Sequence, residues 1–280
     1  MNNKKRTNLE YKQIADSILK KCEEKSKNCP ICSCNAKKYS IKRPTTFRCS
    51  FKLRRHLFNI LRNTPFEGKV EKIPEILEIY DCWLEGLNDK QISWVCRKDR
   101  KAVWKILKKM GEHLIHKFYE RLEPIGGKNI VVEIDESKFG KVKYNRGHRV
   151  DGVWVLGMVE KTPERRIILV PVKDRKANTL IPLLKKYINS ESDIHSDCFK
   201  SYTNLNQNFK NHQTVNHSLW FVDPVSGIHT NTIEGNWAAV KINTPIRKRT
   251  RKNITLNLIR YMLKRKHPVD ILLHLINYFF

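Results

Sequence analysis

Residues 129–135 read NIVVEID, a short apolar run that ends on Asp135. A run of this length and composition is typical of a buried strand, which would deliver its last residue to the rim of a sheet. The run SDIHSD ends in the same way on Asp197, and the helix-like stretch HTNTIEGNWAAVK carries Glu234. Two acids at strand ends and a third on a later helix can meet at one edge of a sheet, so we expect these three carboxylates to lie together.

Three carboxylates at one sheet edge favour one kind of chemistry. Hard oxygen ligands of this type hold Mg²⁺ or Mn²⁺. A pair of such ions activates a water or hydroxyl nucleophile and neutralises the leaving oxygen in phosphodiester chemistry. An aspartate at a strand end is by itself usually a solvated turn residue, so the prediction depends on the three acids occurring in order. The competing acids nearby are Glu133, Glu136, Asp151, Asp174 and Asp193. Asp193 is the strongest of them because it lies in the same predicted strand as Asp197.

The segments around these acids predict a mixed α/β sheet. After Gly126 and Gly127, three strand-like runs follow one another: NIVVEID, VWVLGMV and RIILVPV. An amphipathic helix around NTLIPLLKKYI, the strand SDIHSD and a possible fifth strand QTVNH come next. Pro171 cannot donate a ladder hydrogen bond, which favours a place at the sheet edge for the run RIILVPV. Strands interrupted by a crossover helix are typical of a mixed α/β fold.

The region before the sheet is predicted to be helical. Apolar residues recur at helical spacing over residues 73–87. Asn88 and Asp99 are well placed to cap two further helices, of which the second carries Lys101 and Lys105 on its polar side. The apolar stripe of that second helix consists of Val103, Leu107, Met110, Leu114 and Phe118. A helix, a short turn and a basic helix resemble a helix-turn-helix.

The chain is strongly basic. It has 280 residues, and its 55 lysines and arginines against 28 acids give a formal net charge of +27. Such an excess points to a polyanionic partner, nucleic acid first and an anionic membrane surface second. No run approaches the roughly 18 apolar residues that a membrane span needs. Residues 1–28 are polar and lack the apolar segment of a secretory signal, so we expect an arm or a frayed helix and an intracellular protein.

Basic and histidine residues flank the acids. Residues 241–268 hold ten lysines and arginines and no acid, and residues 138–149 hold six basic residues, one of them a histidine. A charge run is often only a solvated face or a localisation signal, but runs beside these acids favour contact with phosphates. His195 and His229 are candidates for positioning water or DNA, and a structural role fits the sequence as well. The candidate DNA contacts are Lys241, Arg247, Lys248, Arg249 and Arg251, with Lys101 and Lys105 in the helical region.

Taken together, the motifs resemble the core of the Merlin-superfamily transposases and their bacterial ISXO-like insertion-sequence relatives. The resemblance is carried by VEIDESKFGKVKYNRGHRVDGVWVLGMVEK, VPVKDR, SDCFKSY and TVNHSLWFVDPVSGIHTNTIEGNW with the adjoining AAVK, in that order. It covers about residues 128–267 closely and the preceding region more loosely. It implies an RNase H-like catalytic domain with a DDE triad and Mg²⁺ or Mn²⁺ as cofactor. The matching positions are Asp135, Asp197 and Glu234, with Lys241 as the lysine on the same helix.

The cysteines suggest a second metal site. Five of the eight fall within residues 22–49, which in an intracellular protein favours metal binding over disulfides. The motif CPIC is a good half-site for zinc. The related transposases carry a second CxxC, matching Cys49 and then Lys52 here, so His56 or Cys34 would supply the fourth ligand. The candidate set is Cys29, Cys32, Cys49 and His56. A degenerate motif with loose thiols fits the sequence about as well. The remaining cysteines, Cys82, Cys96 and Cys198, are typical of buried thiols.

The resemblance implies a DNA transposase that cuts transposon ends and joins them to target DNA. The predicted organisation is a basic region with a degenerate zinc-ribbon-like motif at 1–70, a helix-turn-helix region at 71–127 and an RNase H-like DDE domain at 128–280. Its partners would be terminal inverted repeats, target DNA and further copies of the chain on DNA. If the source is eukaryotic, we expect the protein in the nucleus. Two alternatives stay open: a catalytically inactive DNA-binding protein derived from a transposase, and an RNase H-like nuclease without strand transfer. A membrane-surface protein is disfavoured because the basic runs lack a long apolar face.

Overall fold

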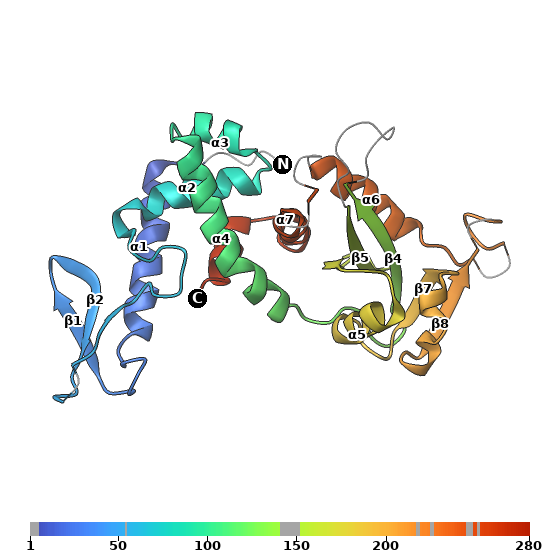
Figure 1. Ribbon diagram of the computed structural model, residues 1–280, viewed down its shortest axis with the longest axis horizontal. Coiled ribbons are helices and arrows are strands. Elements are labelled where there is room, and N and C mark those ends of the chain that lie inside the picture. Colours follow the sequence, from blue (N-terminus) through green and yellow to red (C-terminus); the bar gives the residue numbers. More distant parts are fainter. Residues whose placement is uncertain are drawn as a thin grey trace. The chain divides into compact units, whose positions relative to one another are not determined.

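Figure 1 shows the computed structural model of the chain, which describes residues 6–53, 55–140, 152–216, 219–224, 227–244, 249–250 and 253–280. The chain forms two compact units. The first runs to Lys117 and includes Leu272–Phe280, and the second spans Phe118–Ile271. The predicted division of roles at residues 70 and 127 stays a prediction. No helix within the described ranges is long and apolar enough to cross a membrane.

The first unit begins with helix α1 (Asn8–Lys25). Thr7 and Glu10 form a capping box that satisfies free N–H groups at its start. Tyr11 is buried, and its hydroxyl donates to the Asp81 carboxylate at 2.8 Å. This segment is therefore a packed helix, and the expectation of an arm or a frayed helix is corrected. Its buried positions are few and are separated by charged residues, which hid the helical pattern; they are Tyr11, Ala15, Ile18 and Cys22.

A small antiparallel sheet follows α1, with the strand order β1-β2-β3. Its strands are β1 (Ala36–Ser40), β2 (Arg43–Cys49) and β3 (Leu57–Asn59). Phe47 and Phe58 pair across β2 and β3, and their ring centroids are 6.2 Å apart. So small an apolar core contributes little stability, and small units of this kind usually depend on a metal or on disulfides.

The remaining helical elements of this unit in the described residues are η1 (Val70–Lys72), α2 (Ile73–Leu84), α3 (Asp89–Val95), α4 (Arg100–Glu120) and α8 (Ile271–Asn277). Asn88 caps α3 through a capping box with Gln91, as predicted. Asp99 accepts a hydrogen bond from the Ala102 backbone N–H at 3.0 Å at the start of α4, again as predicted. The apolar stripe of α4 is buried from Val103 to Phe118. Its opposite side therefore stays available to a partner.

The second unit is built on a five-stranded mixed sheet with the order β6-β5-β4-β7-β8. The strands are β4 (Val131–Phe139), β5 (Val153–Glu160), β6 (Ile167–Val172), β7 (Asp193–Asp197) and β8 (Asn211–Val215). Neighbours among β4, β5 and β6 are antiparallel, whereas β7 runs parallel to β4 and β8 runs parallel to β7. The mixed α/β prediction is confirmed, and Pro171 lies in the edge strand β6 as expected.

Helices pack on both faces of this sheet. Side chains alternate along β4, so Val132 and Ile134 enter the core shared with α5 (Ala177–Tyr187). Glu133 and Asp135 point to the other face, where they bond to α6 (Asn231–Asn243). The same alternation places α6 alongside β4 and β5 (Figure 1). Helix α7 (Ile254–Lys266) packs against β6, and the 3₁₀ turns η2 (Lys200–Tyr202) and η3 (Leu205–Gln207) link β7 to β8.

Candidate functional site

The three predicted acids come from neighbouring elements of the second unit. Asp135 lies in the middle of β4, which continues to Phe139, so the expectation that this residue ends its strand is corrected. Asp197 is the last residue of β7, the parallel neighbour of β4, as expected. Each lies two residues beyond the paired residues Glu133 and His195, so the two aspartates reach the same level of the sheet. Glu234 lies in the first turn of α6. The negative charges of Asp197 and Glu234 both act on the Asp135 carboxyl group. The structure therefore places Asp197 and Glu234 within electrostatic reach of Asp135. Among the described residues, the ligand atoms close enough to share one ion are those of a group in the first unit.

The Asp135 carboxyl group is mostly buried and lies near other acids. Burial raises the pKa of Asp135 to about 6, and the charges of Asp197 and Glu234 add to the shift. Hydrogen bonds from the Trp237 indole N–H, at 2.8 Å, and from the Glu136 backbone N–H oppose that shift only in part. Clustered carboxylates without a cation repel one another, and a divalent ion would offset that cost. An all-oxygen donor set fits Mg²⁺ or Mn²⁺.

Glu133 has a different task, because it holds the start of α6. Its side chain is fully buried and accepts hydrogen bonds from the Ile233 backbone N–H at 2.9 Å and from the Thr232 hydroxyl at 2.8 Å. A carboxylate at this position satisfies the free N–H groups of a helix N-terminus and interacts favourably with the helix dipole. Glu133 thereby fixes the turn of α6 that carries Glu234, and its oxygens are already engaged.

A second contact anchors α6 one turn further on. The indole N–H of Trp237 donates to Asp135 Oδ2 at 2.8 Å. The ring lies directly over Gly157, which pairs with Asp135 across β4 and β5. A Cβ atom on Gly157 would come within 2.6 Å of the Trp237 ring, so only glycine admits this close approach. Helix α6 is therefore tied to β4 at two points, and both lie beside Glu234.

The other competing acids lie away from the cluster or serve other contacts. Asp193 begins β7 and pairs with Val131, at the opposite end of the strand from Asp197. Asp174 accepts from the Lys176 backbone N–H at 3.1 Å in the loop before α5. Asp151 lies outside the described residues. Glu136 is the exception, because burial, together with the nearby charges of Asp135 and Asp197, raises its pKa to about 8.

The two flanking histidines lie beside Glu133. His195 is buried on β7 at the position paired with Glu133, and burial lowers its pKa. His229 Nδ1 lies 3.4 Å from Glu133 Oε1, and its Nε2 lies 2.9 Å from Lys161 Nζ. These contacts favour a structural role for His229, which lies between Glu133 and Lys161 in the segment that enters α6.

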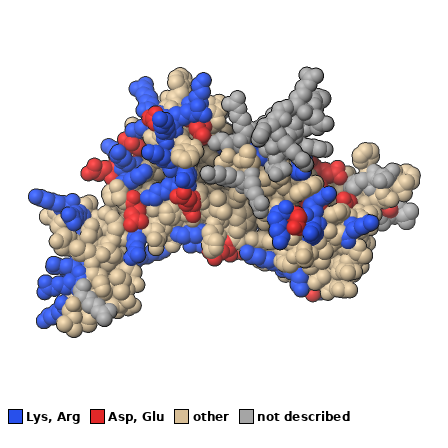
Figure 2. All heavy atoms as spheres, in the orientation of Figure 1, with Lys and Arg blue, Asp and Glu red and all other residues tan. Residues whose placement is uncertain are grey.

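The predicted DNA contacts divide into three groups. Lys241 lies on α6 with its Nζ 5.8 Å from the centroid of the Phe139 ring. The Arg249 guanidinium donates to the backbone carbonyls of Thr244, at 2.9 Å, and of Lys241, so it serves the end of α6. Lys101 and Lys105 are exposed on α4, and Figure 2 shows lysines and arginines gathered over the helical part of the first unit. Arg247, Lys248 and Arg251 lie outside the described residues, as does most of the basic run 138–149.

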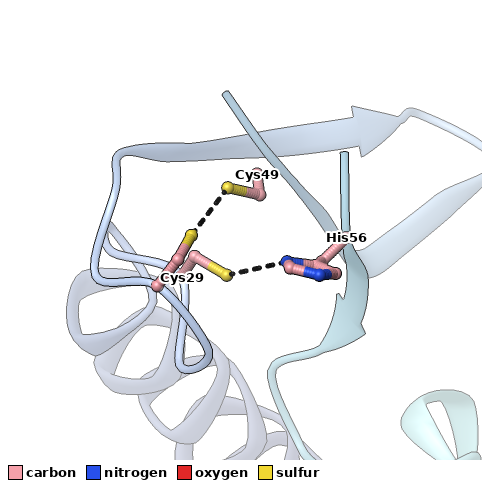
Figure 3. A group of neighbouring side chains, drawn as sticks. Cys29, Cys49 and His56 are labelled. Atoms are coloured by element: carbon pink, nitrogen blue, oxygen red, sulfur yellow. Dashed lines mark hydrogen bonds between the residues drawn. The ribbon is translucent and has the colours of Figure 1, made fainter. Parts of the chain in front are cut away.

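In the first unit, the four predicted zinc ligands converge (Figure 3). The ligand atoms of Cys29, Cys32, Cys49 and His56 all lie within 4.8 Å of one another. Cys29 Sγ is 3.9 Å from His56 Nδ1, and the sulfurs of Cys32 and Cys49 are 3.3 Å apart. Zinc–sulfur bonds of about 2.3 Å in a tetrahedron place sulfur atoms about 3.8 Å apart, so the spacing is compatible with zinc.

The surroundings of these thiols suit a metal site as well. The Phe51 backbone N–H points at Cys49 Sγ at 3.4 Å. A backbone N–H of Cys34 and the Cys49 thiol lower the pKa of Cys32 to about 7, toward the thiolate form that a metal requires. Cys34 itself lies outside the four-residue group, so His56 is the favoured fourth ligand. Among the other predicted thiols, Cys82 and Cys96 are buried, but Cys198 is exposed, which corrects that prediction.

Comparison with known families supports the transposase part of the resemblance. Residues 124–245 match the family model described as the ISXO2-like transposase domain, which supports a DDE-type transposase family. The matched segment contains Asp135, Asp197, Glu234 and Lys241. A search of curated proteins finds no match to the chain. The narrower assignment to the Merlin superfamily stays a proposal.

Reasoning from the sequence missed three residues that shape the site: Glu133 as an anchor, Gly157 and Trp237. One signal was present, because an isolated glycine inside the strand run VWVLGMV indicates a close approach of another element. Nothing in the sequence identifies that element as the ring of Trp237, since the contact joins residues 80 positions apart. The task of Glu133 follows only from the position of α6.

Proposed function

We propose that this chain is a DDE-type DNA transposase that cleaves transposon ends and joins them to target DNA. The observation that carries the proposal is that Asp197 and Glu234 act electrostatically on Asp135 within a segment that matches a transposase domain. The sheet order, with three antiparallel strands followed by two parallel ones and an acid-bearing helix, supports an RNase H-like catalytic domain. The formal charge of +27 supports DNA as the substrate.

In this proposal, Asp135, Asp197 and Glu234 hold divalent cations such as Mg²⁺ or Mn²⁺. When bound, these ions supply the activation of a water or a DNA 3′-OH and the neutralisation of the leaving 3′-oxygen. Trp237 keeps the Asp135 carboxylate in one orientation, and Glu133 keeps the turn that carries Glu234 in place. Lys241, on the same helix, is placed to contact a phosphate of the reacting strand. Hydrolysis and strand transfer can share this site without a covalent protein–DNA intermediate.

The first unit would recognise the transposon ends. Helices α2, α3 and α4 have the order of a helix-turn-helix, and α4 exposes Lys101 and Lys105 opposite its buried stripe. The Cys29, Cys32, Cys49 and His56 group would hold a structural zinc in a zinc-ribbon-like region. We further propose a Merlin-type element, assembly of several copies on DNA and, if the host is eukaryotic, nuclear localisation. Paired ends require two active sites, which is why a single copy is not expected to suffice.

A cleavage and joining assay tests this function and its rivals. Full-length protein is incubated with DNA carrying the inverted repeats that flank its gene, a labelled target plasmid, and Mg²⁺ or Mn²⁺. We expect both cut ends and joined products, and neither with Asp135→Asn. Cutting without joining would favour the nuclease without strand transfer. Specific end binding with neither product would favour the inactive DNA-binding derivative.

A further inference from the structure

Arg175 lies in the loop between β6 and α5, and two aromatic rings hold its side chain. Its guanidinium carbon is 3.9 Å from the centroid of the Trp154 ring and 4.8 Å from that of the Phe199 ring. Stacking on two rings restricts the rotamers of a long side chain and keeps the planar guanidinium in one orientation. The backbone carbonyl of Arg175 also accepts a hydrogen bond from the Ser201 hydroxyl at 2.7 Å, so the loop itself is fixed.

The residues around Arg175 place it beside the carboxylates. The backbone N–H of Phe199 donates to Asp197 Oδ1 at 3.0 Å, so one stacking ring is tied to a predicted metal ligand. Trp154 pairs with Lys138, which follows Asp135 by three residues on β4. Glu136, the residue after Asp135, has its carboxyl group within electrostatic reach of Arg175. Arg175 therefore lies near Glu136 and near the Phe199 ring that follows Asp197.

Alternation along β4 puts this arginine on the other face from α6. Asp135 and Phe139 point toward α6, whereas Glu136 and Lys138 point to the face that α5 covers. Lys138 is exposed, and its Nζ lies 5.6 Å from the centroid of the same Trp154 ring. Lys138 and Arg175 thus form a cationic pair around Trp154, while Lys241 supplies a cation on the α6 face.

The guanidinium N–H groups of Arg175 have no acceptor within the described part of the chain. Other arginines of this unit are engaged: Arg166 pairs with Glu160, and Arg249 donates to two carbonyls. The guanidinium of Arg175 has no hydrogen bond or ion pair with a described residue, although it has five N–H donors. The aromatic rings stack on the plane of the guanidinium, and its N–H groups lie around the edge of that plane. This arrangement suits bidentate binding of an oxyanion such as a phosphate.

We propose that Arg175 and Lys138 form a phosphate-binding subsite for the DNA strand, on the face of the sheet opposite α6. The substrate class is the backbone of a nucleic acid, gripped on one side by this pair and on the other by Lys241. This inference rests on the proposed function for the identity of the substrate. The competing explanation is that Arg175 only packs against Trp154 and Phe199 and offsets the charge of Glu136.

Salt-dependent DNA binding separates these explanations. Full-length wild type and variants are titrated with an end-carrying duplex at several salt concentrations in Ca²⁺, to support binding without turnover. The plot of log K against log salt has a negative slope, and each phosphate contact that is lost makes that slope shallower by about 0.9. We expect that decrease, with Kd raised about three- to tenfold at low salt, for Arg175→Gln. Arg175→Lys should give a slope between those of wild type and Arg175→Gln, because lysine keeps the positive charge but lacks the paired N–H donors of the guanidinium.

Lys186→Gln is the matched control, since Lys186 also lies over an aromatic ring, with its Nζ 4.8 Å from the centroid of Tyr187, but at the far end of α5. It removes the same charge and should leave the slope unchanged. If Arg175→Gln fails to fold, Lys138→Gln tests the subsite at an exposed position. A wild-type slope in the folded variants, while wild type cleaves ends, would overturn the subsite alone. Reduced slopes without any Asp135-dependent cleavage would overturn the transposase proposal and leave the subsite standing. Absence of DNA binding by wild type would contradict both.

Discussion

The two candidate metal centres of this chain are held in different ways. The carboxylates of the second unit lie on hydrogen-bonded strands and on a helix that Glu133 and Asp135 tie down at two points. The thiols of the first unit lie on a loop and a small sheet whose apolar core is little more than Phe47 and Phe58. The carboxylate centre should therefore keep its fold without bound ions. The small sheet around the thiol centre should instead depend on its zinc to fold. Loss of the metal should abolish DNA cleavage at the carboxylate centre and unfold the small sheet at the thiol centre.

The largest effect should follow from the carboxylates themselves. Asp135→Asn, Asp197→Asn and Glu234→Gln each remove a hard ligand, so we expect strand cleavage to fall by about a thousandfold or more. Far-UV circular dichroism and end binding should match wild type, because the sheet does not depend on the ions. Asp193→Asn is the control, since it changes an acid of the same strand at its other end. Substantial cleavage by any of the three variants would remove that residue from the triad.

At the thiol centre the opposite behaviour is expected. Wild type should contain one zinc per chain by metal analysis, and Cys29→Ser should lose it. Because binding free energy at such a site is folding free energy, hydrogen exchange over residues 36–59 should become fast in Cys29→Ser. Exchange in the second unit should be unchanged. Cys34→Ser, which changes a neighbouring thiol outside the ligand group, should keep the metal. A zinc-free wild type with a protected small sheet would instead support a degenerate motif with loose thiols.

The two-point anchoring of α6 can be tested at Gly157. A methyl group there would come within 2.6 Å of the Trp237 ring, so Gly157→Ala should displace α6 and with it Glu234. We expect cleavage to fall by about ten- to a hundredfold, since displacements near 1 Å have effects of that order. The unfolding free energy should fall by about 1–3 kcal/mol. Gly235→Ala is the control on α6 itself, because a Cβ there meets no neighbouring atom within 4 Å. Equal effects of the two substitutions would show that α6 is not held by this contact.

A pH dependence should expose the cost of the buried carboxylate. The pKa of Asp135 is raised from 3.8 to about 6, first by burial. Because the pKa of Asp135 is higher in the folded state, the contribution of Asp135 to the free energy of unfolding is most favourable below pH 3.8 and is lost as the pH rises through about 6. Without divalent ions, Asp135→Asn should therefore be more stable than wild type at pH 7.5, by at most about 3 kcal/mol. The difference in unfolding free energy between Asp135→Asn and wild type should be smaller at pH 5, and it should also be smaller when Mg²⁺ is added.

Hydrogen exchange of the second unit in urea provides the measurement, because it is insensitive to the zinc centre. If the difference in unfolding free energy between Asp135→Asn and wild type is the same at pH 5 and pH 7.5, the pKa of Asp135 is not raised in the folded chain.

The comparison also explains what the sequence could and could not predict. Local patterns sufficed for the strands around Asp135 and Asp197, the caps Asn88 and Asp99, and the edge position of Pro171, because each depends on nearby residues. Contacts across long separations were not predictable, such as Trp237 with Asp135 or Arg175 with Trp154. A helix was one of the two expectations for residues 1–28, but its packing was not predictable, because long-range contacts such as Tyr11 with Asp81 stabilise a segment of mixed polarity. The choice of His56 over Cys34 likewise required the path of β3.

The smallest effect expected concerns Lys241. It follows Glu234 by seven residues on α6, nearly two turns, so both side chains project from one side of the helix. Its ammonium lies 5.8 Å from the centroid of the Phe139 ring and carries no ion pair with a described residue. Lys241→Ala should weaken binding of the cleaved strand severalfold and reduce the salt slope by about 0.9, without changing Mg²⁺ affinity. Lys241→Arg should keep part of the activity, because the charge survives while its geometry changes. If Lys241 only solvates the helix, Lys241→Ala will cleave at the wild-type rate at both low and moderate salt.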